Sequence, residues 1–436
     1  MSLVTSFLMM LQPLAWVMTG PTFCNWTTLL AGWAFAPRRT VTGMLLAAGA
    51  VGKKHHSAFH RVFAQAQWSL DHVGLLVFDM LGPWLQEGDV FLAVDDTLAR
   101  KRGLKVFGAG MHHDPLLSSR GKAVMNWGHS WVVLGVIVRF RRWPERAFCL
   151  PILFRLYLNK KSAQRDCRPY RTRPELAVEM LRILCSHQET RRFHVLADSA
   201  YGGQSVLGKL PRNCDLTSRL LMNARLYGAP QERKPGTHGR PRKRGTLLPT
   251  PEVLLQGRAR HVTIDLYGRH DEVRLCDCEA RVYSVPARPL RVVAVEPLLG
   301  GRTRQAFYST RSEAGAEQVL SWYAMRWSLE VTFHDAKQSL GFEEPQGWTR
   351  RAVERTAPMA MLLYSLIVLW FVEEGHRHYH AFKRPWYTTK QHASFADMLA
   401  TLRRETIREQ VLSLPLTGPG SRKITQALEN IAALAA

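Results

Sequence analysis

The sequence predicts a mixed α/β protein with helical regions at both ends, and three observations support this fold class. Short apolar runs rich in β-branched residues recur between residues 90 and 154 and again at residues 193–197. An apolar stripe at helical spacing starts at Pro174, between two of these runs. A second strand-rich stretch covers residues 261–308, and helical sequence resumes at Ala314. These patterns predict a core sheet interrupted by a β-rich insertion.

The charge of the chain predicts a polyanionic partner. Its 436 residues and 49.6 kDa exceed one ordinary domain, and 46% hydrophobic with 22% charged residues excludes a mostly disordered or fibrous chain. Lys and Arg number 59 against 35 Asp and Glu, a net charge of +24. An enzyme of small neutral substrates has no need of this excess. Each Lys or Arg placed on a nucleic-acid phosphate, in contrast, releases condensed counterions.

The cysteines and the apolar segments predict a cytoplasmic protein. Seven cysteines are scattered, and only Cys276 and Cys278 are close, with a spacing too short for a zinc motif. Reduced thiols in a cytosol are therefore expected. The uncharged segment 357–372 is shorter than the ~20 residues that span a membrane, so it predicts a buried helix and no membrane partner.

Residues 1–87 predict a helical N-terminal region that binds DNA. Its apolar segments are interrupted by basic side chains, namely Arg38, Arg39, Lys53, Lys54 and Arg61. Two interpretations stay open from composition, because the same pattern suits a small DNA-binding domain and a structural helical cap. The DNA-binding interpretation agrees with the overall charge.

Residues 88–215 predict the first part of the catalytic core. The run that starts at Val90 ends at Asp95, and the run that starts at Phe193 ends at Asp198. Open α/β sheets place their chemistry just beyond strand ends, so both aspartates are candidate functional residues. Polar residues often terminate strands, and each aspartate alone is a weak signal.

Residues 216–310 predict a basic linker followed by the β-rich insertion. The linker includes Arg240, Arg242 and Lys243 in a segment rich in Lys, Arg, Gly and Pro. A Gly-Arg-Pro core in basic sequence suits a narrow A·T-rich minor groove. A solvated linker with general phosphate attraction is the alternative interpretation.

Residues 311–375 predict the second part of the core, with one helix at residues 322–340. At about 100° per residue its apolar side chains form a narrow face: Trp322, Met325, Leu329, Phe333, Ala336 and Leu340. Four polar side chains line one edge of that face: Tyr323, Arg326, Glu330 and Lys337. The pattern predicts the opposite face to be polar, with Thr332 on it. An ordinary surface pair between Arg326 and Glu330 is the alternative to a functional cluster.

Residues 376–436 predict a helical C-terminal tail. Ser394 and Asp397 have the spacing of a helix-capping pair before an apolar stripe. The tail therefore serves as a dimerisation element or as a passive cap, and the sequence leaves both open.

Three acids brought together would repel one another unless cations lie between them. Asp95, Asp198 and Glu330 supply hard oxygen ligands, which suit Mg²⁺. Two such ions about 4 Å apart clamp the attacking and leaving oxygens of a phosphodiester. Positive side chains beside the acids would then hold phosphates.

These residues resemble the insertion-sequence transposases that have an RNase H-like catalytic domain and a DDE carboxylate triad. Within them the chain is similar to the group marked by Tyr-x2-Arg-x3-Glu-x6-Lys, which residues 323, 326, 330 and 337 match at every spacing. Asp95-Asp96-Thr97 resembles the first-aspartate motif, and Asp198-Ser-Ala-Tyr-Gly resembles the second. The resemblance runs from about Arg38 to Leu402.

The resemblance implies an RNase H-like mixed-sheet core with a β-rich insertion between the second Asp and the Glu. It implies that Asp95, Asp198 and Glu330 are catalytic metal ligands for two Mg²⁺ ions, with Mn²⁺ as a substitute. The DNA contacts it implies are Tyr323, Arg326, Lys337 and Lys101. Asp96 is adjacent to Asp95, and strand alternation turns only one of them inward. Asp95 is preferred because Thr97 follows it at the family's spacing.

Tryptophans near these motifs are candidates for stacking on an unpaired base. For Trp127 and Trp131, core packing is the favoured interpretation. Trp327 lies outside the predicted apolar arc, so we expect it to contact DNA.

The activity implied is that of a prokaryotic, nucleoid-associated transposase. It binds the terminal inverted repeats of an insertion sequence, cleaves there with Mg²⁺ and joins the 3′-hydroxyl ends to target DNA, acting as a homodimer on paired ends. Three alternatives stay open: a catalytically silent transposase-derived DNA-binding protein, an RNase H-like nuclease without strand transfer, and a recombinase that uses Tyr323 as nucleophile.

Overall fold

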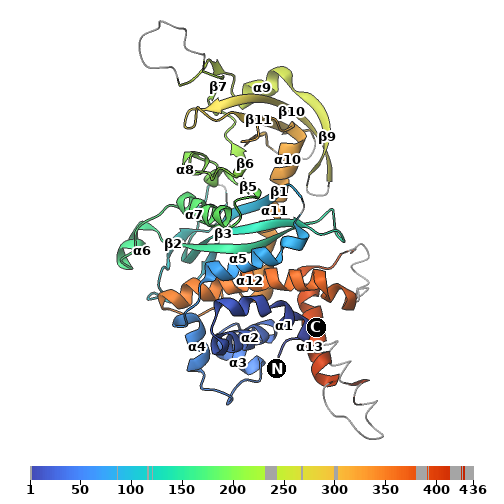
Figure 1. The fold of residues 1–436 in the computed structure, drawn as a ribbon. Coiled ribbons are helices and arrows are strands. Elements are labelled where there is room, and N and C mark those ends of the chain that lie inside the picture. The colour runs from blue at the N-terminus through green and yellow to red at the C-terminus, as the bar shows by residue number, and fades with distance from the viewer. Residues whose placement is uncertain are drawn as a thin grey trace.

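The computed structural model arranges the chain in three tiers, with N-terminal helices at one end, a core sheet in the middle and the β-rich insertion at the other end (Figure 1). It describes residues 2–85, 87–114, 117–119, 121–230, 243–266, 269–298, 303–379, 390, 392–412, 424, 426 and 427.

The core sheet has the mixed order β4-β3-β1-β5-β6. Its antiparallel strands are β1 (Asp89–Arg100), β3 (Met125–Arg139) and β4 (Ala147–Tyr157), and the short β2 (Gly110–His113) also pairs with β3. On the other side of β1, β5 (Arg192–Ala197) and β6 (Cys214–Leu220) run parallel to it. This is the RNase H-like core that the sequence predicts.

β1 is longer than the sequence pattern predicts. The apolar run stops at Asp95, but the strand continues to Arg100, and its pairing with β3 extends to Arg100 opposite Gly128. The prediction of a strand end at Asp95 is therefore wrong. A strand continues through a polar residue when its backbone groups keep their partners on a neighbouring strand, and β3 supplies these partners.

The insertion extends the core sheet. Its elements are β7 (Leu226–Tyr227), β8 (Leu247–Leu248), α9 (Pro251–Arg258), β9 (Arg260–Leu266), β10 (Arg269–Val282), β11 (Leu290–Pro297) and β12 (Gln305–Ser309). β12 pairs antiparallel with β6, and β11 and β10 follow in the same sheet. The boundary expected at residue 216 falls inside β6, because the core and the insertion share that strand.

Helices cover both faces of the core sheet. They are α5 (Leu70–Met80), α6 (Lys160–Arg165), α7 (Arg173–His187), α8 (Gln204–Leu207), α10 (Ala316–Met325), α11 (Trp327–Leu340) and α12 (Arg350–Glu373). α7 begins with a capping box in which Thr172 and Glu175 exchange hydrogen bonds. β4 pairs only with β3 among the described strands, so it is an edge strand of the sheet, and it contacts both α5 and α11.

α12 explains the uncharged segment of the sequence. It is the one helix of the described residues that is long and apolar enough to cross a membrane, and 94% of its apolar window is buried inside the protein. It lies between the core sheet and the N-terminal helices (Figure 1). The prediction of a buried helix at residues 357–372 is confirmed.

The N-terminal helices share one hydrophobic core with the rest of the chain. They are α1 (Thr5–Met10), α2 (Gly20–Phe35), α3 (Val41–Ala47) and α4 (Ser57–Ala64). Trp33 of α2 donates a hydrogen bond to the carbonyl of Leu340 at the end of α11. This region therefore supports the helix that carries Glu330, and a role for it in DNA binding stays a prediction.

The described part of the C-terminal tail packs within the chain. α13 (Phe395–Leu412) starts with the predicted capping pair, in which Asp397 accepts a hydrogen bond from the Ser394 backbone at 2.7 Å. Met398 and Leu402 are fully buried, and α13 contacts α12. The passive-cap interpretation is favoured for this part, because its apolar face is already covered.

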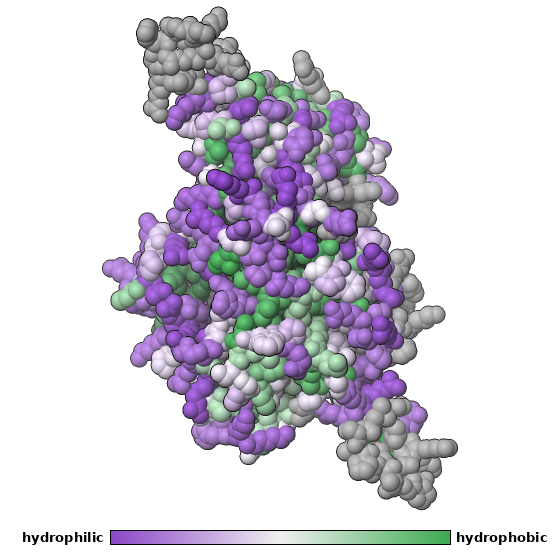
Figure 2. Space-filling view, in the orientation of Figure 1, coloured by the Kyte–Doolittle hydropathy of each residue, from purple (hydrophilic) through white to green (hydrophobic). Residues whose placement is uncertain are grey.

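The hydropathy of the surface differs between the tiers. Figure 2 shows mostly hydrophilic side chains over the insertion and more apolar ones over the lower half of this face. The basic residues 240 and 242, for which DNA contact was predicted, lie outside the described residues.

Candidate active site

Asp95 lies in the middle of β1, opposite Val133 of β3. Its side chain is 18% exposed. The strand register places Asp198 nearby, because Val94 pairs with Ala197 of the parallel strand β5. Asp95 directly follows Val94, and Asp198 directly follows Ala197. The topology therefore brings the two predicted aspartates to neighbouring positions of the sheet.

Glu330 reaches this place through Arg326. The guanidinium of Arg326 donates to Oδ2 of Asp95 at 2.9 Å and to Oε1 of Glu330 at 2.6 Å. The Arg326 side chain is 11% exposed and that of Glu330 is 33% exposed. The Arg326 guanidinium therefore holds the carboxylates of both Asp95 and Glu330 in a largely buried position.

Asp198 is oriented by the turn that follows β5. Its carboxylate caps the short 3-10 helix Ser199–Tyr201 by accepting a hydrogen bond from the Ala200 backbone at 2.9 Å. Its carbonyl accepts a hydrogen bond from the Ser218 hydroxyl on β6 at 2.8 Å. Both contacts fix where the chain leaves the sheet.

The electrostatics of Asp95 reflect its burial and the acids near it. Burial raises the pKa of Asp95 to about 7; the positive charge of Arg326 opposes this shift, and the negative charges of Asp198 and Asp96 add to it. A buried carboxylate beside other acids is costly to ionise. A cation at this position relieves that cost.

Asp96 points away from this cluster. Its carboxylate accepts a hydrogen bond from Tyr201 at 2.8 Å and forms an ion pair with Arg173 at 3.1 Å. Ser130 of β3 donates to the same carboxylate at 3.4 Å. Successive side chains of a strand alternate between faces, so these partners support Asp95 as the residue facing Glu330.

The stretch predicted as one helix consists of two helices. α10 ends at Met325 and α11 begins at Trp327, with a turn at Arg326, where Leu329 donates to the Arg326 carbonyl at 3.0 Å. The apolar face is confirmed at Leu329, Ala336 and Leu340, which are fully buried.

The predicted polar face is wrong at Thr332. Its side chain is fully buried, and its hydroxyl donates to the carbonyl of Cys149 on β4 at 2.8 Å. The hydroxyl is satisfied by a strand that is remote in sequence, so hydropathy alone assigned it to the wrong face. This contact ties α11, and with it Glu330, to the sheet.

The other residues of the signature lie around α10 and α11. Tyr323 is 6% exposed and packs against Phe307 with ring centroids 4.6 Å apart, while the Arg326 guanidinium lies 5.4 Å from its ring. Burial lowers the pKa of Lys337, whose ammonium lies 3.8 Å from Glu343. Trp327 is 51% exposed and so is accessible to a partner.

The remaining candidates separate into buried and exposed groups. Trp131 is 1% exposed, which confirms that it packs in the core. The Lys101 ammonium donates to the carbonyls of Glu343 and Pro345 at 2.8 and 2.9 Å, and burial lowers its pKa to about 8. Lys101 therefore joins the end of β1 to the segment after α11, and its contact with DNA stays a prediction. Lys243, at the end of the basic segment, is exposed.

The donor set fits a hard divalent cation in its chemistry. Asp198 adds a negative charge beside Asp95, and the Arg326 guanidinium joins Asp95 to Glu330. Carboxylate oxygens are the ligands that hard divalent cations take. Within the described residues no group of three His, Cys, Asp or Glu is close enough together to hold a metal ion.

Sequence reasoning missed two groups of residues. Arg173 and Tyr201 contact the Asp96 carboxylate on the far face of the sheet. The capping box of Thr172 and Glu175, which flanks Arg173, was the sequence signal for the position of Arg173. An arginine-lined cavity beside β4 was also missed. The signal for it was a pair of basic residues, Arg350 and Arg351, at the start of a helix, where basic residues are unfavourable.

Comparison with protein families agrees with this geometry. A family model described as DDE superfamily endonuclease matches residues 27–268, and one described as transposase DDE domain matches residues 172–366. No curated protein matches the chain. The first match covers more than half of the chain and includes Asp95 and Asp198, and the second includes Asp198 and Glu330. Members of this family act on DNA and generally use divalent metals. The chain belongs to the DDE superfamily of endonucleases, as a DDE transposase.

Proposed function

We propose that this transposase binds the terminal inverted repeats of an insertion sequence, cleaves DNA at the element ends with Mg²⁺ and joins the 3′-hydroxyl ends to target DNA. The observation that supports the proposal is that Asp95 on β1 lies beside Asp198 at the end of β5 and is joined to Glu330 of α11 through Arg326. Within the family that the chain belongs to, such a cluster suits phosphodiester hydrolysis and strand transfer.

The three carboxylates are the residues that would hold the metal. Bound divalent cations supply the positive charge that activates a water and stabilises the leaving oxygen. Asp95 and Asp198 are positioned by adjacent parallel strands, and Glu330 by the anchoring of α11 on β4. Rigid elements on three sides therefore orient the carboxylate oxygens around one place.

Arg326 has two roles in this proposal. In the present arrangement it neutralises Asp95 and Glu330, and it has to turn away for the acids to share a cation. A guanidinium that turns away keeps several N–H donors in a planar fork that matches a phosphate. We assign it a contact with the DNA backbone beside the scissile bond, with Lys337 and the exposed Trp327 on the same helical segment.

The decisive experiment uses a supercoiled plasmid that bears the element ends found beside the gene. The parent protein with Mg²⁺ releases the element and, with target DNA present, produces joined products. Asp198→Asn and Glu330→Gln reduce cleavage by at least about 10³-fold, because each removes a carboxylate that offsets metal charge.

A matched control comes from the same helix. Asp335 lies on α11, five residues beyond Glu330, and its carboxylate contacts His334. Asp335→Asn is expected to cleave as the parent does. Cleavage by Asp198→Asn and Glu330→Gln at parental rates would show that the triad assignment is wrong.

The same assay separates the alternatives. A silent DNA-binding protein would bind the ends without cutting them, and a simple nuclease would cut without producing joined products. A covalent adduct lost in Tyr323→Phe would indicate a tyrosine recombinase. The burial of Tyr323 against Phe307 argues against that chemistry.

The proposal includes a homodimer that pairs two ends in the nucleoid of a prokaryotic cytoplasm. Light scattering with and without an end duplex tests this part. A complex of two chains with two duplexes is the expected result, and a one-to-one complex at all concentrations would contradict it.

A further inference from the structure

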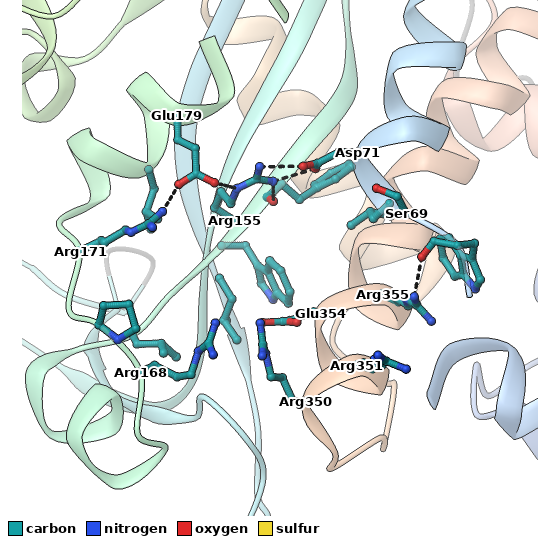
Figure 3. Close-up of a pocket in the computed structure, with 18 residues that line it drawn as sticks. Ser69, Asp71, Arg155, Arg168, Arg171, Glu179, Arg350, Arg351, Glu354 and Arg355 are labelled. Carbon is teal, nitrogen blue, oxygen red and sulfur yellow. Dashed lines mark hydrogen bonds and ion pairs between the residues drawn. The ribbon is translucent and has the colours of Figure 1, made fainter. Parts of the chain in front are cut away.

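A cavity of about 630 Å³ lies at the β4 edge of the core sheet, away from the carboxylate cluster. Six arginines line it: Arg155, Arg168, Arg171, Arg350, Arg351 and Arg355. They come from β4, from the segment before α7 and from the first turns of α12 (Figure 3). We call this site the arginine pocket.

Three of the arginines form ion pairs with the carboxylates that line the arginine pocket. Arg155 forms ion pairs with Asp71 and Glu179, both at 2.8 Å. Arg171 pairs with the other oxygen of Glu179, and Arg350 pairs with Glu354 at 3.1 Å. These pairs link α5, α7 and β4 and account for all three acids that line the cavity.

The other three arginines leave a positive charge uncompensated. Among the described residues, none of Arg168, Arg351 and Arg355 has a carboxylate within ion-pair distance. Arg355 donates instead to the carbonyl of Ala66 at 2.8 Å, and its guanidinium lies 4.5 Å from the Trp68 ring. Burial, together with the charge of Arg351, lowers the pKa of Arg355.

The helix that supplies half of these arginines adds to the positive potential. α12 begins at Arg350 and has no acidic residue in its first turn. The N-terminal end of a helix carries a partial positive charge, and like charges four residues apart repel one another. Arg351 and Arg355 are such a pair. Both effects are unfavourable unless an anion binds, so the sequence at this helix end suits an anionic ligand.

The register of the sheet gives the distance from the arginine pocket to the catalytic strand. Arg155 pairs with Val132, and Val132 pairs with Asp96 beside Asp95. Two strand spacings separate these backbones, roughly 10 Å. The arginine pocket is therefore built on the same sheet as the catalytic strand β1.

We propose that the arginine pocket binds the phosphate backbone of the DNA that flanks the cleavage site. This inference rests on the proposed function and adds a second DNA contact outside the carboxylate cluster. Arg168 and Arg351 are exposed and supply the contacts, while Arg155 and Arg355 hold the walls of the pocket.

The test compares Arg168→Gln/Arg351→Gln with Arg182→Gln/Arg212→Gln. Arg182 and Arg212 are exposed arginines outside the pocket, so both double variants lose the same charge. Binding to a duplex with the element end is measured without divalent metal over a range of salt concentrations. The pocket variant loses on the order of tenfold in affinity per arginine near 0.1 M salt, and its salt slope falls by about 0.9 for each. The control variant binds as the parent does.

A second measurement locates the contact on the DNA. Single phosphates of the duplex are replaced by neutral methylphosphonates. The parent loses affinity at a subset of positions beside the cleavage site, and the pocket variant is insensitive at those same positions. Equal sensitivity of parent and pocket variant at every position would overturn the inference, as would equal losses in the pocket and control variants.

The outcomes separate this inference from the proposed function. A parent that binds and cleaves the element ends, with a pocket variant indistinguishable from the control, overturns the arginine pocket alone. A parent that does not bind the end duplex overturns the proposed function and the inference together. Equal urea unfolding curves for parent and variants establish that the substitutions leave the fold intact.

Discussion

Asp95 on β1 and Glu330 on α11 accept hydrogen bonds from the same guanidinium. Arg326 donates to the first at 2.9 Å and to the second at 2.6 Å, and Asp198 adds a further negative charge beside Asp95. One arginine therefore holds together two acids that are distant in sequence. We expect this relationship to govern the stability of the site without metal.

Arg326→Gln is expected to destabilise the metal-free protein. Removing one partner of a largely buried ion pair leaves uncompensated charge, and we expect a loss of about 3 kcal/mol in the free energy of unfolding in EDTA. Mg²⁺ should then stabilise the variant more than the parent, because it replaces the missing charge. Urea unfolding with EDTA and with Mg²⁺ measures both effects.

Arg377→Gln, which removes an exposed pair with Glu374, serves as the control and is expected to change stability by less than about 1 kcal/mol. An unaltered Mg²⁺ response in Arg326→Gln would contradict this assignment.

Thr332→Val tests the anchor of α11. The substitution keeps the shape of the side chain but removes the hydroxyl that donates to the Cys149 carbonyl at 2.8 Å. The hydroxyl also donates to the Ser328 carbonyl at 3.0 Å. Loss of a buried hydrogen bond costs about 0.5–1.5 kcal/mol in the free energy of unfolding, so the unfolding midpoint should fall by a corresponding amount. Thr190→Val, at an exposed turn position, is the comparison and should leave the midpoint unchanged. Equal stability of the two variants would show that the hydrogen bond is dispensable.

Stability should fall as the pH is lowered below about 6.5. Burial lowers the pKa of His129 to about 3 and those of His112 and His194 to about 4, from an ordinary value near 6.5. Between these values the unfolded chain binds protons that the folded chain does not, so acid favours unfolding. Each fully buried histidine contributes about 1.4 kcal/mol per pH unit in this window.

Urea unfolding at pH 7 and pH 5 checks this dependence. His129→Gln should reduce the slope of stability against pH, whereas His113→Gln, at an exposed position, should keep the parental slope. The raised pKa of Asp95, about 7, opposes this trend but is one group against three, so stability that is constant from pH 7 to pH 5 would contradict the prediction.

Neutralising Arg240, Arg242 and Lys243 tests the basic segment between β7 and β8. The two strands are paired, and the Gly228 backbone donates to the Thr246 carbonyl at 2.9 Å, so both ends of the segment are anchored. Arg244 lies 4.0 Å from the Tyr283 ring and adds to this anchor. If the segment enters a minor groove, the triple Gln variant loses more affinity for an A·T-rich than for a G·C-rich duplex. Equal losses on both duplexes would indicate general phosphate attraction instead.

Local patterns predicted much of the architecture. The helix start near Pro174 and the capping pair at Ser394 both begin helices, and the uncharged segment at residues 357–372 forms the buried helix α12. The alternation rule, with Thr97 as a marker, selected Asp95 over Asp96, and the partners of Asp96 lie on the other face. These features depend on neighbours a few residues apart, which a single sequence displays directly.

Other expectations failed where distant segments meet. β1 runs through Asp95 because β3 continues to pair with it, and Thr332 is buried because a β4 carbonyl accepts its hydroxyl proton. Lys101 donates to two carbonyls beyond α11, a contact that the sequence did not predict. In each case the partner is remote in sequence, so no local pattern contains it.

By itself the sequence determined that the partner is DNA and named the candidate acids, because net charge and residue spacing are properties of the chain that need no coordinates. Only the tertiary structure decided which acids share a guanidinium and that arginines from β4, the segment before α7 and α12 line one cavity. Electrostatic interactions depend on distance through space and on burial, and both are settled only when the strands pair and the helices pack.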